Sequence, residues 1–451
     1  MNKKKNLIFL FLFFSLASCS FDNRVTQGIW SGLEDEKKRI IELEKEQIKE
    51  SKRKKVYSST STYYKEKILT KKITLSKPKK NSSWKTSGLN NQNFLGNIFL
   101  SGIENRFLKK KIGKNKLSLS PVTTLPLVHK KNIFLSDDKG TIFNITEFGD
   151  IIWKKNIYKK IYKRIHKNLT FAIHNNNIYV ADNIGFIYAI TLETGKLIWI
   201  KNHGIPLKSK IKIFNEQIFL INQDNRILSF STKDGSIIWN VRSPSSFIKS
   251  QNLLSLALTK QGDVIASTSA GDLLKINSIN GNVDWSLNSL GALFADDTDF
   301  FKSSDVVIID NSIIFSTQKS IFSYNLNSGY MNWRANVSSI ATPIIDNKNI
   351  FFVTENGYFV IVNIDTGEII SSSYILKVLK ERKQLTKITG FIMGSGKIYS
   401  VTLNGYLIVS SAISGKVENF KKIGNPVTSL PIINDGKLFI YTEKSRILGF
   451  N

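Results

Sequence analysis

The stretch Asp182-Asn-Ile-Gly-Phe-Ile-Tyr-Ala-Ile-Thr-Leu-Glu-Thr-Gly-Lys-Leu-Ile-Trp199 decides the fold of this 451-residue chain. Its apolar and polar residues alternate in short runs, which is typical of half-buried β-strands. Glycines separate the runs and supply the positive φ that a tight hairpin needs. On the last run Leu197 and Trp199 share one face, and Ile198 points to the other. The stretch therefore predicts two strands joined by a tight turn.

The end of this stretch is one copy of a Gly-x-x-x-Trp phrase that recurs along the chain. The full copies are Gly149–Trp153, Gly195–Trp199, Gly235–Trp239, Gly281–Trp285 and Gly329–Trp333. Two degenerate copies follow, with Ser371 and Asn419 in place of the tryptophan. The mean spacing of about 44 residues suits one propeller blade of four short strands. We expect the recurring rings to wedge between adjacent blades rather than to form a stacking platform for sugars or bases. These structural residues are Trp153, Trp199, Trp239, Trp285 and Trp333.

The two ends of the repeat region complete each other. The last unit stops after three strands, and its residues 425–433 resemble residues 120–128 at the start of the first unit. The segment around Phe107 parallels residues 419–424, which belong to a fourth strand. We therefore predict an all-β fold, a single eight-bladed β-propeller whose last four-stranded blade is closed by an N-terminal strand. Such closure removes exposed sheet edges.

The N-terminus has the features of an export signal. Three lysines precede an apolar run from Leu7 to Leu16, which is too short to span a bilayer. The run ends in Leu-Ala-Ser-Cys19, a sequence similar to a bacterial lipobox, so residues 1–18 are predicted to be a lipoprotein signal peptide and Cys19 the lipidated residue. A plain signal peptide with an incidental cysteine is the alternative. Ser20, rather than aspartate, follows the cysteine, and by the known sorting rule this favours the periplasmic face of the outer membrane.

Between the cysteine and the repeats lies a charged segment, residues 19–93, which we expect to be a largely flexible tether. Residues 94–451 are expected to form the propeller. The tether is rich in lysine and is either a solvated spacer or a segment attracted to anionic lipid or an acidic partner. The whole chain has a formal net charge of +29. Export and the lack of a recognisable aromatic–basic module argue against nucleic acid as the partner.

The pattern of residues 182–199 is similar to the PQQ-type propeller repeat, and eight such units behind a lipobox resemble the BamB family of outer-membrane assembly lipoproteins. This resemblance implies a non-catalytic scaffold of the β-barrel assembly machinery, a monomer within a hetero-complex. Its implied partner is the POTRA region of the barrel-inserting subunit, and nascent outer-membrane proteins are a further candidate.

Two loops that exceed the repeat length carry the partner-binding residues that the resemblance implies. The first spans residues 242–250 and contains Ile248 and Lys249, an apolar residue followed by a basic one. The second spans residues 293–305 and contains Asp299 and Asp305. This sequence departs from the family pattern at Ser246, where the resemblance would place a second leucine.

A PQQ-dependent quinoprotein dehydrogenase is the enzymatic alternative, since such enzymes share this repeat. They resemble one another in a vicinal cysteine pair, which a chain with one cysteine cannot form. Its four histidines are scattered singly, and no catalytic or dinucleotide motif is recognisable. We therefore expect no catalytic residues, no metal and no cofactor. A propeller scaffold for another envelope partner is the third hypothesis.

Overall fold

The computed structural model divides the chain into two compact units, Met1–Thr60 and Ser61–Asn451. The structure describes residues 38, 41–42, 63, 65–115, 124–162, 164–243, 253–269, 271–288, 303–317, 319–337, 339, 341–380 and 385–451. Residues 38, 41 and 42 of the first unit are helical.

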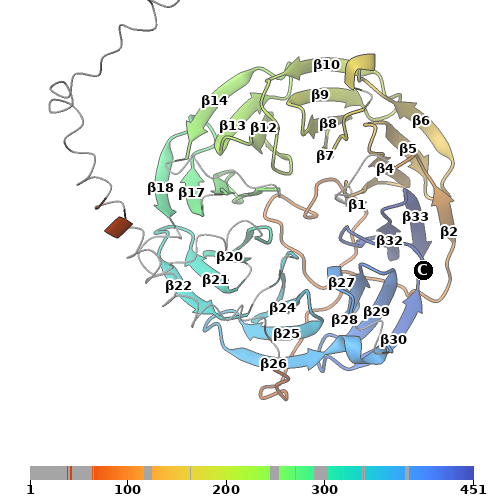
Figure 1. Cartoon of the computed structure of the whole chain (residues 1–451), viewed down its shortest axis with the longest axis vertical. Helices are drawn as coiled ribbons and strands as arrows, with labels where there is room; N and C mark the ends of the chain where they lie inside the picture. Colours follow the sequence, from red (N-terminus) through yellow and green to blue (C-terminus); the bar gives the residue numbers. More distant parts are fainter. Residues whose placement is uncertain are drawn as a thin grey trace, which may run out of the picture. The chain divides into compact units, whose positions relative to one another are not determined.

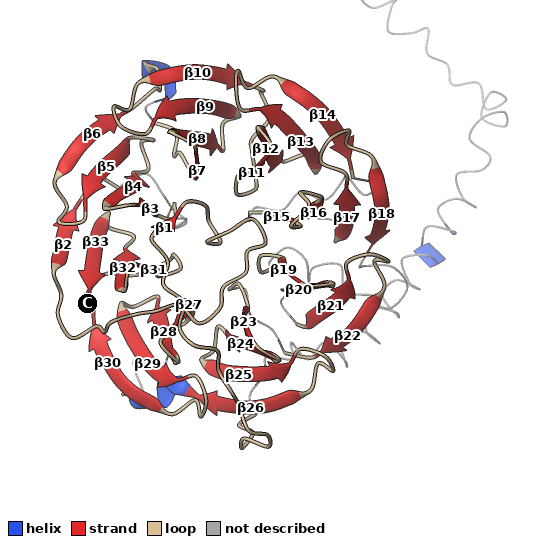
Figure 2. Ribbon diagram, turned by 180° about the vertical axis from the view of Figure 1, so that it is seen from behind, coloured by secondary structure: helices blue, strands red, loops and turns tan. Residues whose placement is uncertain are grey.

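The described residues form eight antiparallel sheets arranged around a centre (Figures 1 and 2). From innermost to outermost strand, the first four blades are β3 (Leu127–His129), β4 (Asn132–Ser136), β5 (Ile142–Thr146), β6 (Ile151–Lys155); β7 (Leu169–His174), β8 (Asn177–Asp182), β9 (Phe186–Thr191), β10 (Leu197–Asn202); β11 (Lys212–Phe214), β12 (Gln217–Ile221), β13 (Arg226–Ser231), β14 (Ile237–Arg242); and β15 (Ser255–Leu258), β16 (Val264–Ser267), β17 (Asp272–Ile276), β18 (Val283–Asn288). The next three are β19 (Val307–Ile309), β20 (Ser312–Ser316), β21 (Ile321–Asn325), β22 (Met331–Ala335); β23 (Ile344–Asp346), β24 (Asn349–Val353), β25 (Tyr358–Asn363), β26 (Ile369–Tyr374); and β27 (Ile388–Gly394), β28 (Lys397–Thr402), β29 (Tyr406–Ser411), β30 (Val417–Lys422).

The eighth blade joins the two ends of the propeller. Its three inner strands are β31 (Ile432–Asn434), β32 (Lys437–Tyr441) and β33 (Arg446–Phe450), and its outermost strand is β2 (Leu108–Lys111). Strands β2 and β33 pair antiparallel, with Leu108 opposite Gly449. The Phe107 ring packs edge-on against Phe439, with 5.9 Å between the ring centroids. The eight-bladed fold and its closure by an N-terminal strand are thus confirmed.

The tryptophans of the Gly-x-x-x-Trp phrases lie between neighbouring blades. Each indole N–H donates a hydrogen bond to a main-chain carbonyl of the next blade. The pairs are Trp153 with Leu192 (3.1 Å), Trp199 with Thr232 (2.9 Å), Trp239 with Ser278 (2.7 Å), Trp285 with Leu326 (3.1 Å) and Trp333 with Ile364 (2.8 Å). A buried indole N–H needs an acceptor, so this hydrogen bond determines how each ring is oriented between its two blades.

In five blades the glycine that opens the phrase lies against the tryptophan of the preceding blade. All five glycines have a φ between +66° and +76°, and a Cβ on any of them would lie within 3.0 Å of the indole. They are Gly195, Gly235, Gly281, Gly329 and Gly367. A phrase with both residues therefore serves two interfaces: its tryptophan packs against the next blade, and its glycine leaves space for the tryptophan of the preceding blade.

A register shift precedes the tryptophan on the outermost strands. In β6 this bulge leaves Ile151 and Ile152 both about half-exposed, although strict alternation would bury one of them.

Residues 81–101, which we call the strap, run around the centre of the ring and contact every blade in turn (Figure 1). The strap begins at the eighth blade, where Asn81 donates a side-chain hydrogen bond to the Ile433 carbonyl. Strand β1 (Ser83–Trp84) then pairs with β3 of the first blade. The strap returns to the eighth blade at Ser101, whose N–H donates to Gly436.

Main-chain hydrogen bonds join the strap to the innermost strands of the intermediate blades. The N–H groups of Ile173, Leu258, Ile308 and Ile345 donate to the carbonyls of Lys85, Asn91, Gln92 and Leu95 at 2.8, 2.8, 3.0 and 3.0 Å. The side chain of Asn91 reaches the Ile213 carbonyl of the third blade, and Ile98 bridges to Gly394 of the seventh.

Most of the strap falls within the segment that the sequence predicts to be a flexible tether. In the structure Trp84 and Asn93 of this segment are buried. Its residues lack a strand or helix period because they bond to one blade after another at irregular intervals. The sequence therefore gives no periodic signal for this part of the packed body.

A buried lysine holds the middle of the strap. The Lys212 ammonium group lies 2.7 Å from the Asn90 carbonyl oxygen and 2.6 Å from Oδ1 of Asn93. The Asn93 amide in turn donates to the carbonyls of Leu256 and Val306. Burial lowers the pKa of Lys212 to about 7, although the Asp305 carboxylate opposes this effect.

The glycine–tryptophan contact can be tested with a matched pair of glycines. Gly235 and Gly204 both have a φ of +73°, but a Cβ would lie 2.4 Å from the Trp199 ring at Gly235 and would meet nothing within 4 Å at Gly204. Both alanine variants lose about 1–2 kcal/mol to the left-handed backbone. We expect Gly235→Ala to lose about 1–3 kcal/mol more, because the interface is overpacked. Equal unfolding free energies for the two variants in urea titrations would contradict this contact.

The buried lysine predicts a pH dependence of stability. Between about pH 7 and the ordinary lysine value of 10.5, the unfolded chain keeps a proton that folded Lys212 has released. Stability therefore rises with pH in this range, by up to about 1.4 kcal/mol per pH unit. We expect the wild type to gain stability over Lys212→Met between pH 7 and pH 9. Lys131→Met, at an exposed position, is the control and should follow the wild type. A stability difference between wild type and Lys212→Met that does not change with pH would rule out this role.

Candidate docking site

The two faces of the ring differ in what covers them. The strap bonds near the ends of the innermost strands, as at Ile173 of β7, and to the turns that follow them, as at Asp435 and Gly436 after β31. Because neighbouring strands are antiparallel, the outermost strands end at the opposite face. Both long loops singled out in the sequence leave the blades at that opposite face, after β14 and after β18. We call it the loop face.

The first long loop is fixed at both ends. At its start the Ser243 hydroxyl donates a buried hydrogen bond to the Asp272 carboxylate of the next blade. At its end the Leu254 N–H donates to the Lys208 carbonyl at 2.6 Å, and Ser209 bridges to Leu254. Ile248 and Lys249, the partner-binding residues predicted in this loop, lie outside the described residues.

The second long loop ends at Asp305, which is held inside the ring. Its carboxylate accepts from the Lys210 ammonium at 2.5 Å and from the Thr342 hydroxyl at 2.8 Å, and the side chain is only 13% exposed. Burial alone would raise the pKa of Asp305, but Lys210, Thr342 and Lys212 together hold it below its usual value. Asp305 is therefore an ionised group whose partners lie within the chain.

The segment before β11 joins the ends of both loops. Lys208 accepts from the end of the first loop and Lys210 pairs with the end of the second. The sequence reasoning did not select Lys208, Lys210 or Thr342. Their only signal was a pair of lysines two residues apart before a short strand, a pattern too common in this lysine-rich chain to stand out.

The other predicted functional residues have no described position. Cys19 and Asp299 lie outside the described residues. Asp305 is thus the one predicted partner-binding residue that the structure places, and it lies at the base of its loop.

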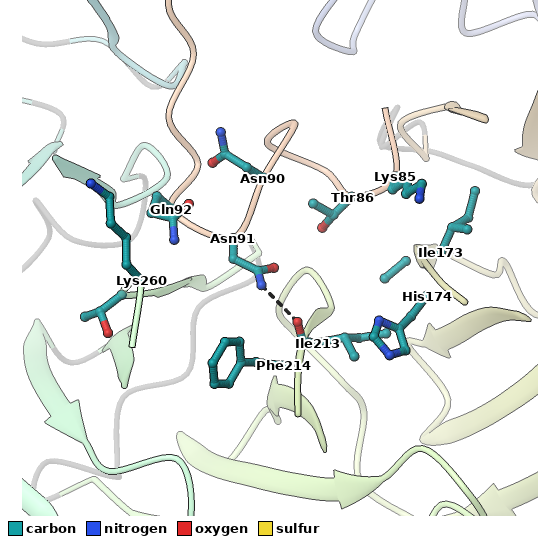
Figure 3. A pocket seen from close by; sticks show the side chains of 12 residues that line it. Lys85, Thr86, Asn90, Asn91, Gln92, Ile173, His174, Ile213, Phe214 and Lys260 are labelled. Carbon is teal, nitrogen blue, oxygen red and sulfur yellow. Dashed lines mark hydrogen bonds between the residues drawn. The ribbon is translucent and has the colours of Figure 1, made fainter. Parts of the chain in front are cut away.

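A cavity lies on the strap face, between the strap and the second to fourth blades (Figure 3). Amide residues of the strap, apolar residues such as Ile173 and Phe214, and the cationic residues Lys85 and Lys260 line this cavity of about 360 Å³. The hydrogen bond from Asn91 to the Ile213 carbonyl crosses it, at 2.9 Å. His174 also lines the cavity and pairs with Glu216 at 3.0 Å. The lining contains no carboxylate or thiol, so it lacks the usual anionic ligands for a metal ion.

The described residues contain no group of three or more His, Cys, Asp or Glu side chains that could hold a metal ion. Burial lowers the pKa of His129, His166 and His203, each of which lies at a separate place in the ring. Within the described part of the chain, no helix is long and apolar enough to cross a membrane.

Comparisons with curated proteins agree with this architecture. The chain is 20% identical over 301 residues to the outer membrane protein assembly factor BamB of Moranella endobia, covering 61% of this chain and 72% of that protein. It is 21% identical over 337 residues to the protein of the same name from Escherichia coli K12, covering 62% and 84%.

Solved structures show the same fold at lower identity. BamB from Moraxella catarrhalis matches with a TM-score of 0.60 at 11% identity, over 76% of this chain and 99% of that one. A europium-containing methanol dehydrogenase matches with a TM-score of 0.61 at 9% identity, over 80% and 89%. Fold alone therefore does not separate a scaffold from an enzyme. The family profile described as outer membrane protein assembly factor BamB matches residues 146–373, which is just over half of the sequence. This chain therefore belongs to the BamB family.

Proposed function

We propose that this protein is a non-catalytic scaffold of the outer-membrane β-barrel assembly machinery. It is anchored at the periplasmic face of the outer membrane through lipid on Cys19. Its loop face binds the POTRA region of the barrel-inserting subunit and so aids the assembly of outer-membrane proteins. Membership of the BamB family is the observation that carries the proposal. In this proposal residues 1–18 are removed, and the lipidated residue becomes the first of the mature chain.

The arrangement of the loop ends supports the choice of surface. Lys208 and Lys210 hold the ends of the two long loops two residues apart on one segment. The loops therefore leave neighbouring places on the same face, where one partner domain can contact both. Ile248, Lys249 and Asp299 are the contact residues in this proposal.

Asp305 contributes to docking indirectly in this proposal. Its carboxylate is engaged by Lys210 and Thr342, so it sets where the second loop begins. A carboxylate with these internal partners is poorly suited to accept a further cation from another protein.

The contact residues can be tested by affinity purification. We expect the lipidated wild type to recover the POTRA-bearing subunit, and Asp299→Lys and Lys249→Glu to reduce that recovery about tenfold, as expected for lost complementary contacts. Asp234→Lys is the control, because Asp234 is exposed in a turn between β13 and β14 on the strap side. Failure of the wild type to recover the subunit would overturn the proposed function. Equal recovery by all variants would overturn only the residue assignment.

A double-mutant cycle separates a positioning role of Asp305 from direct contact. If Asp305 acts through Lys210, then Asp305→Asn and Lys210→Met weaken partner recovery by similar amounts, and the double variant is no worse than either. If Asp305 contacts the partner directly, the two losses add. Urea unfolding of each variant, run in parallel, corrects for lost stability.

A further inference from the structure

Basic side chains gather on one half of the loop face. The outermost strands of the seventh, eighth, first and second blades end at this face in Phe-Lys-Lys, Lys-Lys-Lys, Trp-Lys-Lys and Ile-Lys-Asn. The equivalent strands of the third to sixth blades end in Asn-Val-Arg, Ser-Leu-Asn, Trp-Arg-Ala and Ser-Ser-Tyr. The strand ends of these four consecutive blades therefore present an arc of positive charge, whereas those of the other four blades carry only Arg242 and Arg334.

Most lysines of this arc are available to an external partner. Lys110 and Lys421 form ion pairs with Asp150 and Glu104. Within the described part of the chain, the remaining cations of the arc make no salt bridge. They are Lys109, Lys111, Lys154, Lys155, Lys201 and Lys422 on the strands, and Lys159, Lys160 and Arg164 in the loop that follows β6. Asp137 and Asp138, two carboxylates of the same face, are buried.

The loop after β6 is firmly held to the second blade. Tyr158 and Tyr162 both pack edge-on against Phe186 of β9, with ring centroids 6.0 and 5.5 Å apart. The Tyr158 hydroxyl donates to Asp182, and the Lys167 ammonium donates to the Tyr162 carbonyl. The aromatic side chains of the loop are thus used to fix its base.

The tip of this loop is apolar and exposed. It contains the short helix η2 (Lys160–Tyr162), drawn in blue beside β10 in Figure 2. Ile161 is 76% exposed and Ile165 is 45% exposed. Lys159, Lys160 and Arg164, all exposed, flank them. An isolated isoleucine at the surface is common, but two on one loop tip flanked by cations form an amphipathic element.

We propose that this half of the loop face binds the surface of a membrane that contains anionic phospholipids. The lysine arc lies against the phosphate head groups, and Ile161 and Ile165 enter the boundary between head groups and acyl chains. Charge complementarity favours a lipid surface, since the arc spans four blades in one plane and has an apolar tip at its margin. The proposal goes beyond docking of a partner protein, which uses the long loops of the third and fourth blades.

Vesicle binding tests the proposal without the predicted lipid anchor. Residues 19–451 carrying Cys19→Ser are mixed with vesicles of phosphatidylcholine, either alone or with about one third phosphatidylglycerol, and the vesicles are sedimented. We expect binding to the anionic vesicles only, and weakening by salt. Lys159→Glu together with Lys160→Glu should reduce binding at least about tenfold, because each reversal replaces attraction by repulsion. Ile161→Ser should also reduce binding while leaving the net charge unchanged.

A matched control distinguishes this surface from the high charge of the whole protein. Lys196 and Lys233 are exposed lysines in turns on the strap side, and their double reversal to glutamate removes the same charge. Equal loss of binding in the two double variants would overturn the proposal, as would wild-type binding that does not depend on phosphatidylglycerol.

A dye attached to cysteine reports insertion of the tip. Cys19 is the chain's single cysteine, so Cys19→Ser combined with Ile161→Cys gives one labelling site. An environment-sensitive dye there should shift to the blue on anionic vesicles, and the same dye at Lys196→Cys should not. Vesicle binding without this shift would show that the protein binds the anionic head groups but does not insert the tip. That result would contradict the proposed role of Ile161. Failure of vesicle binding with intact recovery of the POTRA-bearing subunit would reject this inference and leave the proposed function standing.

Discussion

Closure of the ring is the constraint on which the rest of the structure depends. Each blade is a small sheet that cannot bury both of its faces alone, so it is stable only between two neighbours. The eighth blade can contact the first because its outermost strand, β2, comes from the N-terminal side and hydrogen bonds to β33 at the end of the chain. Every contact between blades, including the five indole hydrogen bonds, requires that this pairing holds the circle closed.

The strap adds a second closure at the centre. It contacts all eight blades with main-chain hydrogen bonds and amides, and it leaves and returns at the eighth blade. Lys212 joins its middle to the third blade through a buried amine. Because the strap covers the centre at one face, the two faces of the ring have different chemistry. The strap face contains fixed main chain and amides, while the loop face keeps its long connections.

The charges of the loop face divide it into two parts. Towards the third to fifth blades, cations are used internally, as in the pair of Lys210 with Asp305. Towards the seventh, eighth, first and second blades, lysines at the strand ends point to solvent. A net charge of +29 is therefore not spread evenly over this face. This separation allows one face to serve a protein partner and a lipid surface at different places.

The sequence by itself determined the repeat, the number of blades, the closure by the segment near Phe107 and the family, because periodic strands and a recurring glycine–tryptophan phrase are local signals. It did not predict the strap, whose residues bond to distant blades without any period. It also did not predict that Asp305 would be buried against Lys210 and Thr342, which lie 95 and 37 residues away in the chain. Only the closed ring brings these groups together, so the ion pair, the lysine arc and the apolar tip were decided by the tertiary structure.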